Sequence, residues 1–309
     1  MNSASNQPKP SWLITGANGF LGSNAGYFLQ GKVRRIGLGR TPPNATLIDA
    51  FIEADLTNPA SITTGILQAQ PSVVLHTAAL ASHEECERDP QRAHEINVLG
   101  TQAVAQAAQE VGALLILTST DAVFDGQRGN YSESDEPSPF SVYGETKLLS
   151  EVVAFKNCEK TIVARTNFFG WSPTGNRSIL EFFVHSLEQG KPISGYTDFV
   201  VTSIYAQNLL EALWSLTNQE FRGLINIGSS DPQSKFDFGR QVAQSFGLDA
   251  SLISPNVSPQ LSGSLSRRRD ISLSTELLAA QLGTPISTQL EGITKAHLEL
   301  AAVTSAVSI

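Results

Sequence analysis

The N-terminal segment constrains the fold most strongly, because it joins a short apolar run to a glycine-rich turn. Residues 12–15 are almost entirely apolar and stop at Gly16, which predicts a buried first strand. Gly16, Gly19 and Gly22 are spaced three apart, and residues 21–29 then predict a helix. In such a strand–turn–helix the glycines permit a tight turn, a close approach to a pyrophosphate and close helix packing. The helix start offers free N–H groups to phosphates, so the segment predicts a dinucleotide site.

Strands and helices alternate over the next part of the chain. Further strands are predicted over residues 33–38, 73–75, 114–117 and 161–164, with helices over 93–111 and 141–155. Residues 114–117 carry no polar side chain, as expected of a strand covered by helices on both faces. This alternation is typical of a doubly wound parallel sheet.

The alternation loosens beyond Thr166. Helices are predicted over residues 179–187, 205–216, 238–246 and 275–282, with a strand over 224–227. We therefore predict an α/β protein: a Rossmann doubly wound parallel sheet with a smaller C-terminal α+β substrate lobe. Residues 11–166, completed by about 197–228, are assigned to the dinucleotide-binding domain, and residues 167–196 and 229–309 to the substrate-binding lobe.

Composition excludes several classes of function. The formal net charge of −8 repels phosphate backbones, so no nucleic-acid partner is expected. We expect no membrane span either, because no apolar run approaches about 20 residues. Cys86 and Cys158 form no CxxC pair, and the five histidines have no metal-ligand spacing, so no metal site is predicted. With a polar N-terminus unlike a signal peptide, these features predict a cytoplasmic protein.

The end of the second predicted strand bears on the choice of cofactor. NAD-binding folds usually carry Asp or Glu there, to bond the ribose 2′-hydroxyl. This chain has Arg40, whose fixed positive charge suits a 2′-phosphate. We therefore predict NADP(H), with NAD(H) and an ordinary surface role for Arg40 left open.

A tyrosine and a lysine lie four positions apart in the predicted helix 141–155. Tyr143 and Lys147 share one helix face, and a lysine ammonium favours the phenolate of a tyrosine whose pKa is near 10. Tyr143 can then exchange a proton with a carbonyl oxygen or an alcohol. Upstream, Thr120 follows a buried strand, where its hydroxyl can bond a substrate carbonyl or simply cap the strand.

These motifs together resemble a known family. The shared segments are the glycine turn and residues 76–79, 97–101, 119–121 and 143–147. They are similar to the extended short-chain dehydrogenase/reductases. A narrower resemblance is to the dTDP-4-dehydrorhamnose reductases. It lies in residues 119–126 followed by 143–147, and in residues 84–87 before Asp89 and Pro90. The resemblance covers nearly the whole chain and is strongest over residues 73–151.

The resemblance implies roles for individual residues. Tyr143 is the expected proton donor, Lys147 holds the nicotinamide ribose and tunes Tyr143, and Thr120 polarises the substrate carbonyl. The residues expected to bind the cofactor are Gly16, Asn18, Gly19, Phe20, Leu21, Gly22, Arg40, Asp55, Leu56, Ala78, Ala79, Leu80, Tyr143 and Lys147. In the family, NADPH reduces the C4 ketone of a deoxyhexose attached to a nucleoside diphosphate.

The second half departs from the family pattern in two places. Residues 198–204 replace an Asp-Gln-Tyr/Phe-Gly-Ser/Ala-Pro-Thr stretch that lies near the substrate. Residues 268–273 match an Arg-Pro motif without its proline, and Arg268 is the expected contact of the diphosphate. These departures leave the identity of the ketone open.

The leading hypothesis is an NADPH-dependent reductase of a ketosugar nucleotide, of the dTDP-4-dehydrorhamnose to dTDP-rhamnose type. Three alternatives stay open: a nucleotide-sugar epimerase, a reductase of another ketone, and a non-catalytic NADP-binding regulatory subunit like the methionine adenosyltransferase β subunit. Dehydration is disfavoured, because Ala122 stands where dehydratases carry Glu. A homodimer through the helices 93–111 and 141–155 is expected from the family.

Overall fold

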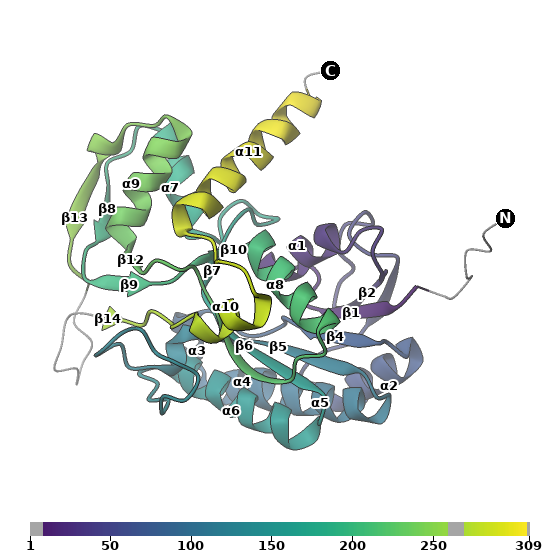
Figure 1. Cartoon of the computed structure of the whole chain (residues 1–309). Coiled ribbons are helices and arrows are strands. Elements are labelled where there is room, and N and C mark those ends of the chain that lie inside the picture. The colour runs from purple at the N-terminus through teal and green to yellow at the C-terminus, as the bar shows by residue number, and fades with distance from the viewer. Residues whose placement is uncertain (1–8, 259–268, 308–309) are drawn as a thin grey trace. The chain divides into compact units, whose positions relative to one another are not determined.

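The computed structural model describes residues 9–258 and 269–307 of the chain (Figure 1). Its internal contacts divide the chain into two compact units. The first unit comprises Met1–Leu117 and Leu149–Ile162, and the second comprises Thr118–Leu148 and Val163–Ile309. The glycine turn therefore belongs to the first unit, and Thr120, Tyr143 and Lys147 to the second.

The central element is a seven-stranded parallel sheet with the order β11-β6-β5-β4-β1-β2-β3. The strands are β1 (Ser11–Thr15), β2 (Arg34–Gly39), β3 (Ala50–Glu53), β4 (Val73–His76), β5 (Leu114–Thr120), β6 (Thr161–Thr166) and β11 (Gly223–Ile227). The order 3-2-1-4-5 is that of a Rossmann sheet, which confirms the predicted fold class. The edge strand β11 lies in the segment predicted to complete this sheet.

Helices cover both faces of the sheet in the first unit. Helix α1 (Phe20–Phe28) lies on one face, and α2 (Pro59–Ala69) and α5 (Gly100–Glu110) pack against each other on the opposite face (Figure 1). The strands between them are buried on both sides, and Leu13 and Ile14 of β1 are fully buried. Helix α2 was not predicted, although Asn58 caps it, with its side chain accepting from Ser61 N, and a proline follows the cap.

The helix predicted over residues 93–111 is present as a continuous helical run over residues 90–110, but it contains a π-helical turn that was not predicted. Helices α3 (His83–Arg88) and α4 (Pro90–His94) are followed by a π-helical turn, η1 (Glu95–Leu99), before α5 begins. The carbonyl oxygen of Asn97 accepts from Thr101 Oγ1 at 2.5 Å and from Ser150 Oγ at 2.7 Å. The Asn97 side chain also bonds the backbone of Leu80. These contacts stabilise the wider turn, which an apolar repeat does not reveal.

The second unit contains small sheets and a set of helices. Its short strands are β7 (Phe168–Phe169), β8 (Ile193–Tyr196), β9 (Phe199–Val201), β10 (Ile204–Tyr205), β12 (Gln233–Ser234), β13 (Ile253–Asn256) and β14 (Arg269–Asp270). Its helices include α7 (Ile179–Glu188), α8 (Ala206–Asn218), α9 (Lys235–Phe246), α10 (Glu276–Leu282) and α11 (Gln289–Val307). The strands pair as β12-β9-β14, β13-β8 and β10-β7.

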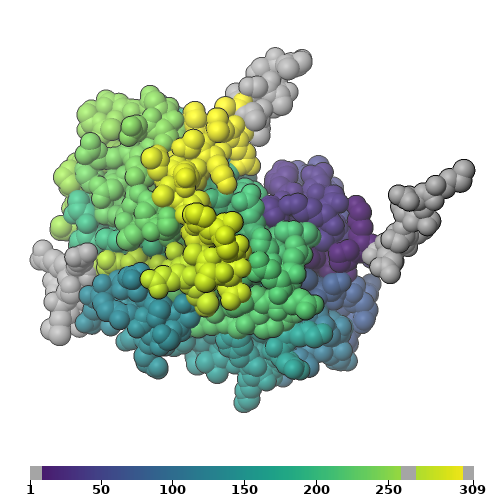
Figure 2. Space-filling view, in the orientation of Figure 1, coloured from purple at the N-terminus to yellow at the C-terminus, as the bar shows by residue number. Residues whose placement is uncertain are grey.

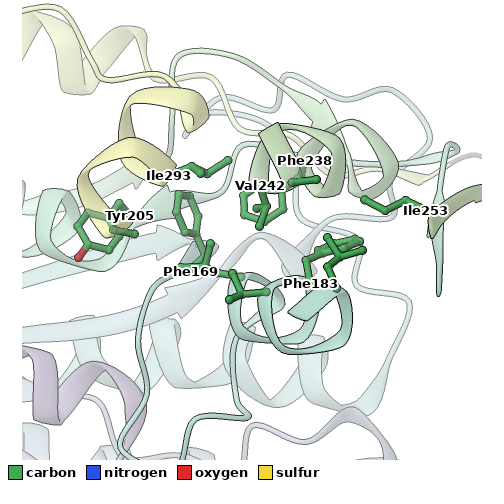
Figure 3. Close-up of a cluster of buried hydrophobic side chains, with 12 residues drawn as sticks. Phe169, Phe183, Tyr205, Phe238, Val242, Ile253 and Ile293 are labelled. Carbon is green, nitrogen blue, oxygen red and sulfur yellow. The ribbon is translucent and has the colours of Figure 1, made fainter. Parts of the chain in front are cut away.

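A separate hydrophobic core holds the second unit together. Phe169, Phe183 and Phe238 are buried at its centre and come from β7, α7 and α9 (Figure 3). A β-carbon on Gly239 would lie 2.3 Å from the Phe183 ring, so the glycine lets α9 pack closely on α7. The yellow C-terminal helices α10 and α11 lie against the green α8 and α9 (Figure 2).

Two elements begin in one unit and end in the other. Strand β5 enters the second unit at Thr118, and α6 (Val142–Asn157) leaves it after Leu148. Within the described residues, no helix combines the length and apolar character of a membrane span.

Candidate functional site

The glycine turn packs tightly against the loop that follows β4. Gly16 has a φ of +68°, and a β-carbon there would lie 3.0 Å from the Cα of Ala78. A β-carbon on Gly22 would lie 2.2 Å from the Gly16 carbonyl oxygen. Gly16 and Gly22 must therefore remain glycine for the turn to close, as the sequence predicts.

The start of α1 suits an anionic group. Gly19 is the N-cap residue, no side chain caps the helix, and its first turn has no acidic residue. The first N–H groups of a helix have no partner within the helix and attract phosphate oxygens. Phe20 and Leu21 contribute these backbone groups, while the Leu21 side chain is buried in the core. The turn therefore fits the pyrophosphate of a dinucleotide.

Polar residues after β2 and β3 lie at the same edge. The Asn18 amide donates to the Thr41 carbonyl oxygen at 2.6 Å, linking the glycine turn to the loop after β2. Arg40 is exposed in that loop. The pKa of Asp55 is lowered mainly by the backbone N–H of Thr57, with a smaller contribution from the charge of Arg40. The Ala54 N–H donates to the Gly39 carbonyl oxygen at 2.9 Å, so the residues directly before Asp55 and Arg40 are hydrogen-bonded to each other.

A hydrogen-bonded chain fixes the loop 77–80. Thr15 Oγ1 lies 2.7 Å from His76 Nδ1, and His76 Nε2 lies 3.0 Å from Thr101 Oγ1. Thr15 Oγ1 also accepts from the backbone N–H groups of Thr77 and Ala78, each at 3.2 Å. Sequence reasoning assigned no role to Thr15 and left His76 unassigned. Their positions at the ends of β1 and β4 were the available signal.

The remaining residues predicted for the cofactor lie around this loop. The Asn97 side chain makes two hydrogen bonds to the backbone of Leu80. The Leu80 N–H donates to Asn97 Oδ1 at 2.8 Å, and Asn97 Nδ2 donates to the Leu80 carbonyl oxygen at 3.1 Å. A β-carbon on Gly100 would lie 3.1 Å from the Leu56 carbonyl oxygen, so this backbone approaches α5 closely. Within the first unit, the predicted residues therefore gather where β1–β4 end.

Thr120 ends β5 in the second unit and is buried. Its hydroxyl accepts from the Ala122 N–H at 3.1 Å and donates to Asp121 Oδ1 at 3.1 Å. The strand-capping role weighed from the sequence is therefore present. The hydroxyl hydrogen can turn from Asp121 to a carbonyl oxygen, since hydroxyl groups rotate to suit their acceptors.

The start of α6 lies against the chain just after Thr120. The Gly144 N–H donates to Ser141 Oγ at 3.1 Å, which caps the helix. A β-carbon on Gly144 would lie 2.2 Å from the Ala122 carbonyl oxygen. This approach brings Tyr143 close to the end of β5. One turn later, the buried Lys147 donates to the Thr118 carbonyl oxygen at 2.8 Å.

Asp121 is a buried carboxylate that sequence reasoning did not assign to the site. Asn167 Nδ2 donates to Asp121 Oδ2 at 2.9 Å, and Ser203 Oγ donates to Asn167 Oδ1 at 2.5 Å. Burial raises the pKa of Asp121 from 3.8 to about 6, against the hydrogen bonds of Asn167 and Thr120 and the charge of Lys235. Asp121 therefore changes charge near pH 6, directly beside Thr120.

The structure groups the predicted residues into two sets, one in each unit. The first set surrounds the glycine turn, and the second contains Thr120, Tyr143 and Lys147. Arg268, predicted to contact a diphosphate, lies outside the described residues.

Known proteins resemble this chain over almost its full length. Residues 11–301 match the family described as the RmlD substrate binding domain. A probable low-salt glycan biosynthesis reductase of Haloferax volcanii is 26% identical over 276 residues, 88% of this chain and 92% of the relative. The methionine adenosyltransferase 2 subunit beta of Danio rerio is 29% identical over 259 residues, 79% of this chain and 76% of the relative.

A solved structure has the same fold. The dTDP-4-dehydrorhamnose reductase of Bacillus anthracis strain Ames, in complex with NADP, aligns with a TM-score of 0.80 and 23% identity. The alignment covers 94% of this chain and 99% of that one. Sheet order and glycine turn thus define a Rossmann-type α/β protein. Because the family match spans nearly the whole chain, the protein belongs to the RmlD substrate-binding domain family.

Proposed function

We propose that the chain is an NADPH-dependent reductase of a ketosugar nucleotide. The observation that carries this proposal is the approach of Gly144 to Ala122, which brings Tyr143 toward Thr120, with Lys147 one turn along the same helix. Membership of the family and the reductase names of relatives support it.

Each of the three residues has a distinct proposed role. Thr120 Oγ1 donates a hydrogen bond to the substrate carbonyl oxygen, which polarises the ketone. Tyr143 gives its hydroxyl proton to that oxygen as the ketone becomes an alcohol. The Lys147 ammonium stabilises the phenolate that remains, and its bond to the Thr118 carbonyl oxygen holds it in place. Oxygen thus gains the proton while the carbonyl carbon gains a hydride.

NADPH would supply the hydride when bound, and NADH is the alternative donor. Residues of the glycine turn would hold the pyrophosphate, and Arg40 with Asp55 the adenosine end. The remaining proposed contacts are Asn18, Leu56, Ala78, Ala79 and Leu80 in the first unit, and Tyr143 and Lys147 in the second. The uncapped start of α1 and the exposed guanidinium of Arg40 support this fit.

The proposed substrate is a nucleotide sugar with a 4-keto group, of the dTDP-4-dehydrorhamnose type. Relatives named dTDP-4-dehydrorhamnose reductase support the sugar class, including one from Streptomyces griseus, 35% identical over 146 residues. We keep Arg268 as the proposed diphosphate contact. The same proposal includes the predicted domain division. Residues 11–166 and about 197–228 would bind the cofactor, and residues 167–196 and 229–309 the substrate.

The proposal includes a homodimer and a cytoplasmic protein. Leu149, Val152 and Phe155 are 44%, 55% and 43% exposed on α6, and Leu99 before α5 is 43% exposed. Such apolar exposure on neighbouring turns of one helix suits a helix-to-helix contact.

The test is NADPH oxidation by the purified protein with dTDP-4-keto-6-deoxy-L-lyxo-hexulose, generated in place. The Tyr143→Phe variant should lose turnover by a factor of about 10² or more while still binding NADPH. Tyr27→Phe is the matched control, because Tyr27 is exposed on α1. Equal turnover by Tyr143→Phe and the wild type would refute the proposed role of Tyr143.

One alternative has a specific observation behind it. The methionine adenosyltransferase subunit of Danio rerio matches most of this chain. NADPH binding without any ketone reduction, together with copurification of a larger enzyme, would favour a regulatory subunit. Tightly bound NAD that survives purification would instead favour an epimerase.

A further inference from the structure

Two cationic side chains flank one aromatic ring in the second unit. Strand β9 is the middle strand of the sheet β12-β9-β14, and the three strands lie side by side (Figure 1). Ser234 of β12 pairs with Val200, and Arg269 of β14 pairs with Phe199. Lys235 follows Ser234 directly. The sheet register therefore brings Lys235 and Arg269 to Phe199 from its two sides.

The distances define a cluster of two aromatic rings and two cations. Lys235 Nζ lies 4.1 Å from the centre of the Phe199 ring. Arg269 Cζ lies 5.9 Å from the same ring and 5.3 Å from the ring of Phe140. Phe140 is three residues before Tyr143. Arg269 therefore connects β9 to the segment that leads into the proposed catalytic helix.

The charge of Lys235 is poorly compensated. Burial lowers the pKa of Lys235, the charge of Arg269 lowers it further, and the charge of Asp121 opposes both effects. Burial also lowers the pKa of Arg269, opposed by Asp198. Within residues 9–258 and 269–301, the Lys235 ammonium contacts the Phe199 ring and has no hydrogen-bond or ion-pair partner.

Two like charges that lie close together and are partly buried repel each other, and an anion between them relieves both the repulsion and the lost hydration. Lys235 is also the first residue of α9, where the helix dipole adds a positive potential. Arg269 contacts the ring of Phe140, three residues before Tyr143, and the charges of Lys235 and Asp121 act on each other's pKa. The cluster therefore lies toward the proposed position of the ketone.

We propose that Lys235 and Arg269 bind an anionic oxygen group of the substrate, either a phosphate or a carboxylate. The inference rests on the proposed function in one respect, that the ligand is the substrate of the reductase. An ammonium and a guanidinium are the usual protein partners of such groups. Phe199 belongs to residues 198–204, where the sequence departs from the family pattern, so this cluster is a feature of the chain's own substrate choice.

The test measures ligand binding by isothermal titration calorimetry on the full-length protein. Thymidine 5′-diphosphate against thymidine reports a phosphate, and UDP-glucuronate against UDP-glucose, which both carry the diphosphate, reports a carboxylate on the sugar. If the bound group is a phosphate, Lys235→Gln should weaken binding of all three diphosphates about tenfold or more and leave thymidine unchanged. If it is a carboxylate, Lys235→Gln should weaken only the binding of UDP-glucuronate.

Two further variants keep the result interpretable. Arg240→Gln is the matched control, because Arg240 is an exposed cation on the same helix that lies over Phe236, and it should bind all four ligands like the wild type. Lys235→Arg keeps the charge and should retain most of the affinity, which separates loss of charge from loss of folding. The inference is overturned if Lys235→Gln binds thymidine 5′-diphosphate and UDP-glucuronate as well as the wild type does, or if the wild type binds neither of them.

Turnover measured in parallel separates this inference from the proposed function. A wild type that binds thymidine 5′-diphosphate through Lys235 but oxidises no NADPH would overturn the reductase and keep the anion site. Turnover on the ketosugar with an unchanged KM in Lys235→Gln would keep the reductase and overturn the anion site.

Discussion

A β-carbon on Gly144 would lie 2.2 Å from the carbonyl oxygen of Ala122. No side chain larger than hydrogen fits that gap unless α6 and the chain after β5 move apart. Tyr143, the proposed proton donor, directly precedes Gly144. Thr120, which is proposed to donate a hydrogen bond to the substrate carbonyl, lies two residues before Ala122. One contact between backbones therefore positions the start of α6, which carries Tyr143, against the chain that follows Thr120.

We predict that Gly144→Ala will impair both stability and turnover. The added methyl group forces a backbone shift, which costs about 1–3 kcal/mol in a packed region. A β-carbon on Gly39 meets no atom within 4 Å, so Gly39→Ala is the matched control for thermal stability. Melting temperatures from calorimetry check the prediction, and equal values for the two variants would contradict it.

The buried carboxyl of Asp121 should make stability depend on pH. Its pKa is raised from 3.8 to about 6 by burial, so the folded state favours the protonated carboxyl. The stability that this group contributes is complete below about pH 4 and is lost as the pH rises through about 6. The difference between the two pKa values corresponds to about 3 kcal/mol. Asp121→Asn should therefore gain stability relative to the wild type between pH 4 and pH 7.

Asp135 offers a control with the opposite sign. The backbone N–H of Ser132 and the guanidinium of Arg128 lower the pKa of Asp135 to about 2. Its contribution is present above pH 4 and is lost only as the pH falls through about 2. The difference in melting temperature between Asp135→Asn and the wild type should therefore be the same at every pH between 4 and 7. A constant offset for Asp121→Asn as well would contradict the proposed titration.

Arg40 should decide between the two nicotinamide cofactors. Removing its guanidinium removes the proposed partner of the 2′-phosphate. Arg40→Gln should weaken NADPH binding about tenfold or more and leave NADH binding nearly unchanged. Fluorescence titration with both cofactors measures this, and Arg34→Gln is the control, because Arg34 is exposed at the start of β2, the strand that Arg40 follows. Equal losses for both cofactors would indicate a structural role of Arg40.

The apolar residues of α6 should form the proposed dimer contact. Val152 is 55% exposed, and Val152→Glu would place a charge in a contact between copies. The variant should elute as a monomer in size-exclusion chromatography with light scattering, while the wild type elutes as a dimer. Leu298, 63% exposed on α11, gives the control Leu298→Glu. A wild-type monomer at micromolar concentration would remove the dimer from the proposal.

Short-range patterns were sufficient for much of the fold. The strand, the glycine turn and the helix at residues 11–28 follow from local spacing, and the observed sheet order confirms the predicted class. The π-turn at Glu95–Leu99 was missed, because it depends on bonds from Asn97 to Leu80 and Ser150, far apart in sequence. No periodicity within a window of ten residues contains those partners.

The cluster around Phe199 was missed for a similar reason. Lys235 and Arg269 reach one ring only through the register of β12 and β14 on β9, and their own segments look like ordinary polar sequence. Asp121 was visible beside Thr120, yet its burial depends on Asn167 and on elements later in the chain. Local spacing predicted the proposed catalytic pair, whereas long-range strand pairing determined what surrounds it.

Strand β5 and helix α6 each cross from one unit to the other, so neither unit is a continuous stretch of chain. During synthesis, the first unit lacks Leu149–Ile162 until those residues have left the ribosome. The first unit is thus complete only after the segment Thr118–Leu148 of the second unit has been synthesised. Cutting the gene at any single point therefore cannot yield either unit whole, and a split version of this protein would have to reassemble from fragments that are each incomplete.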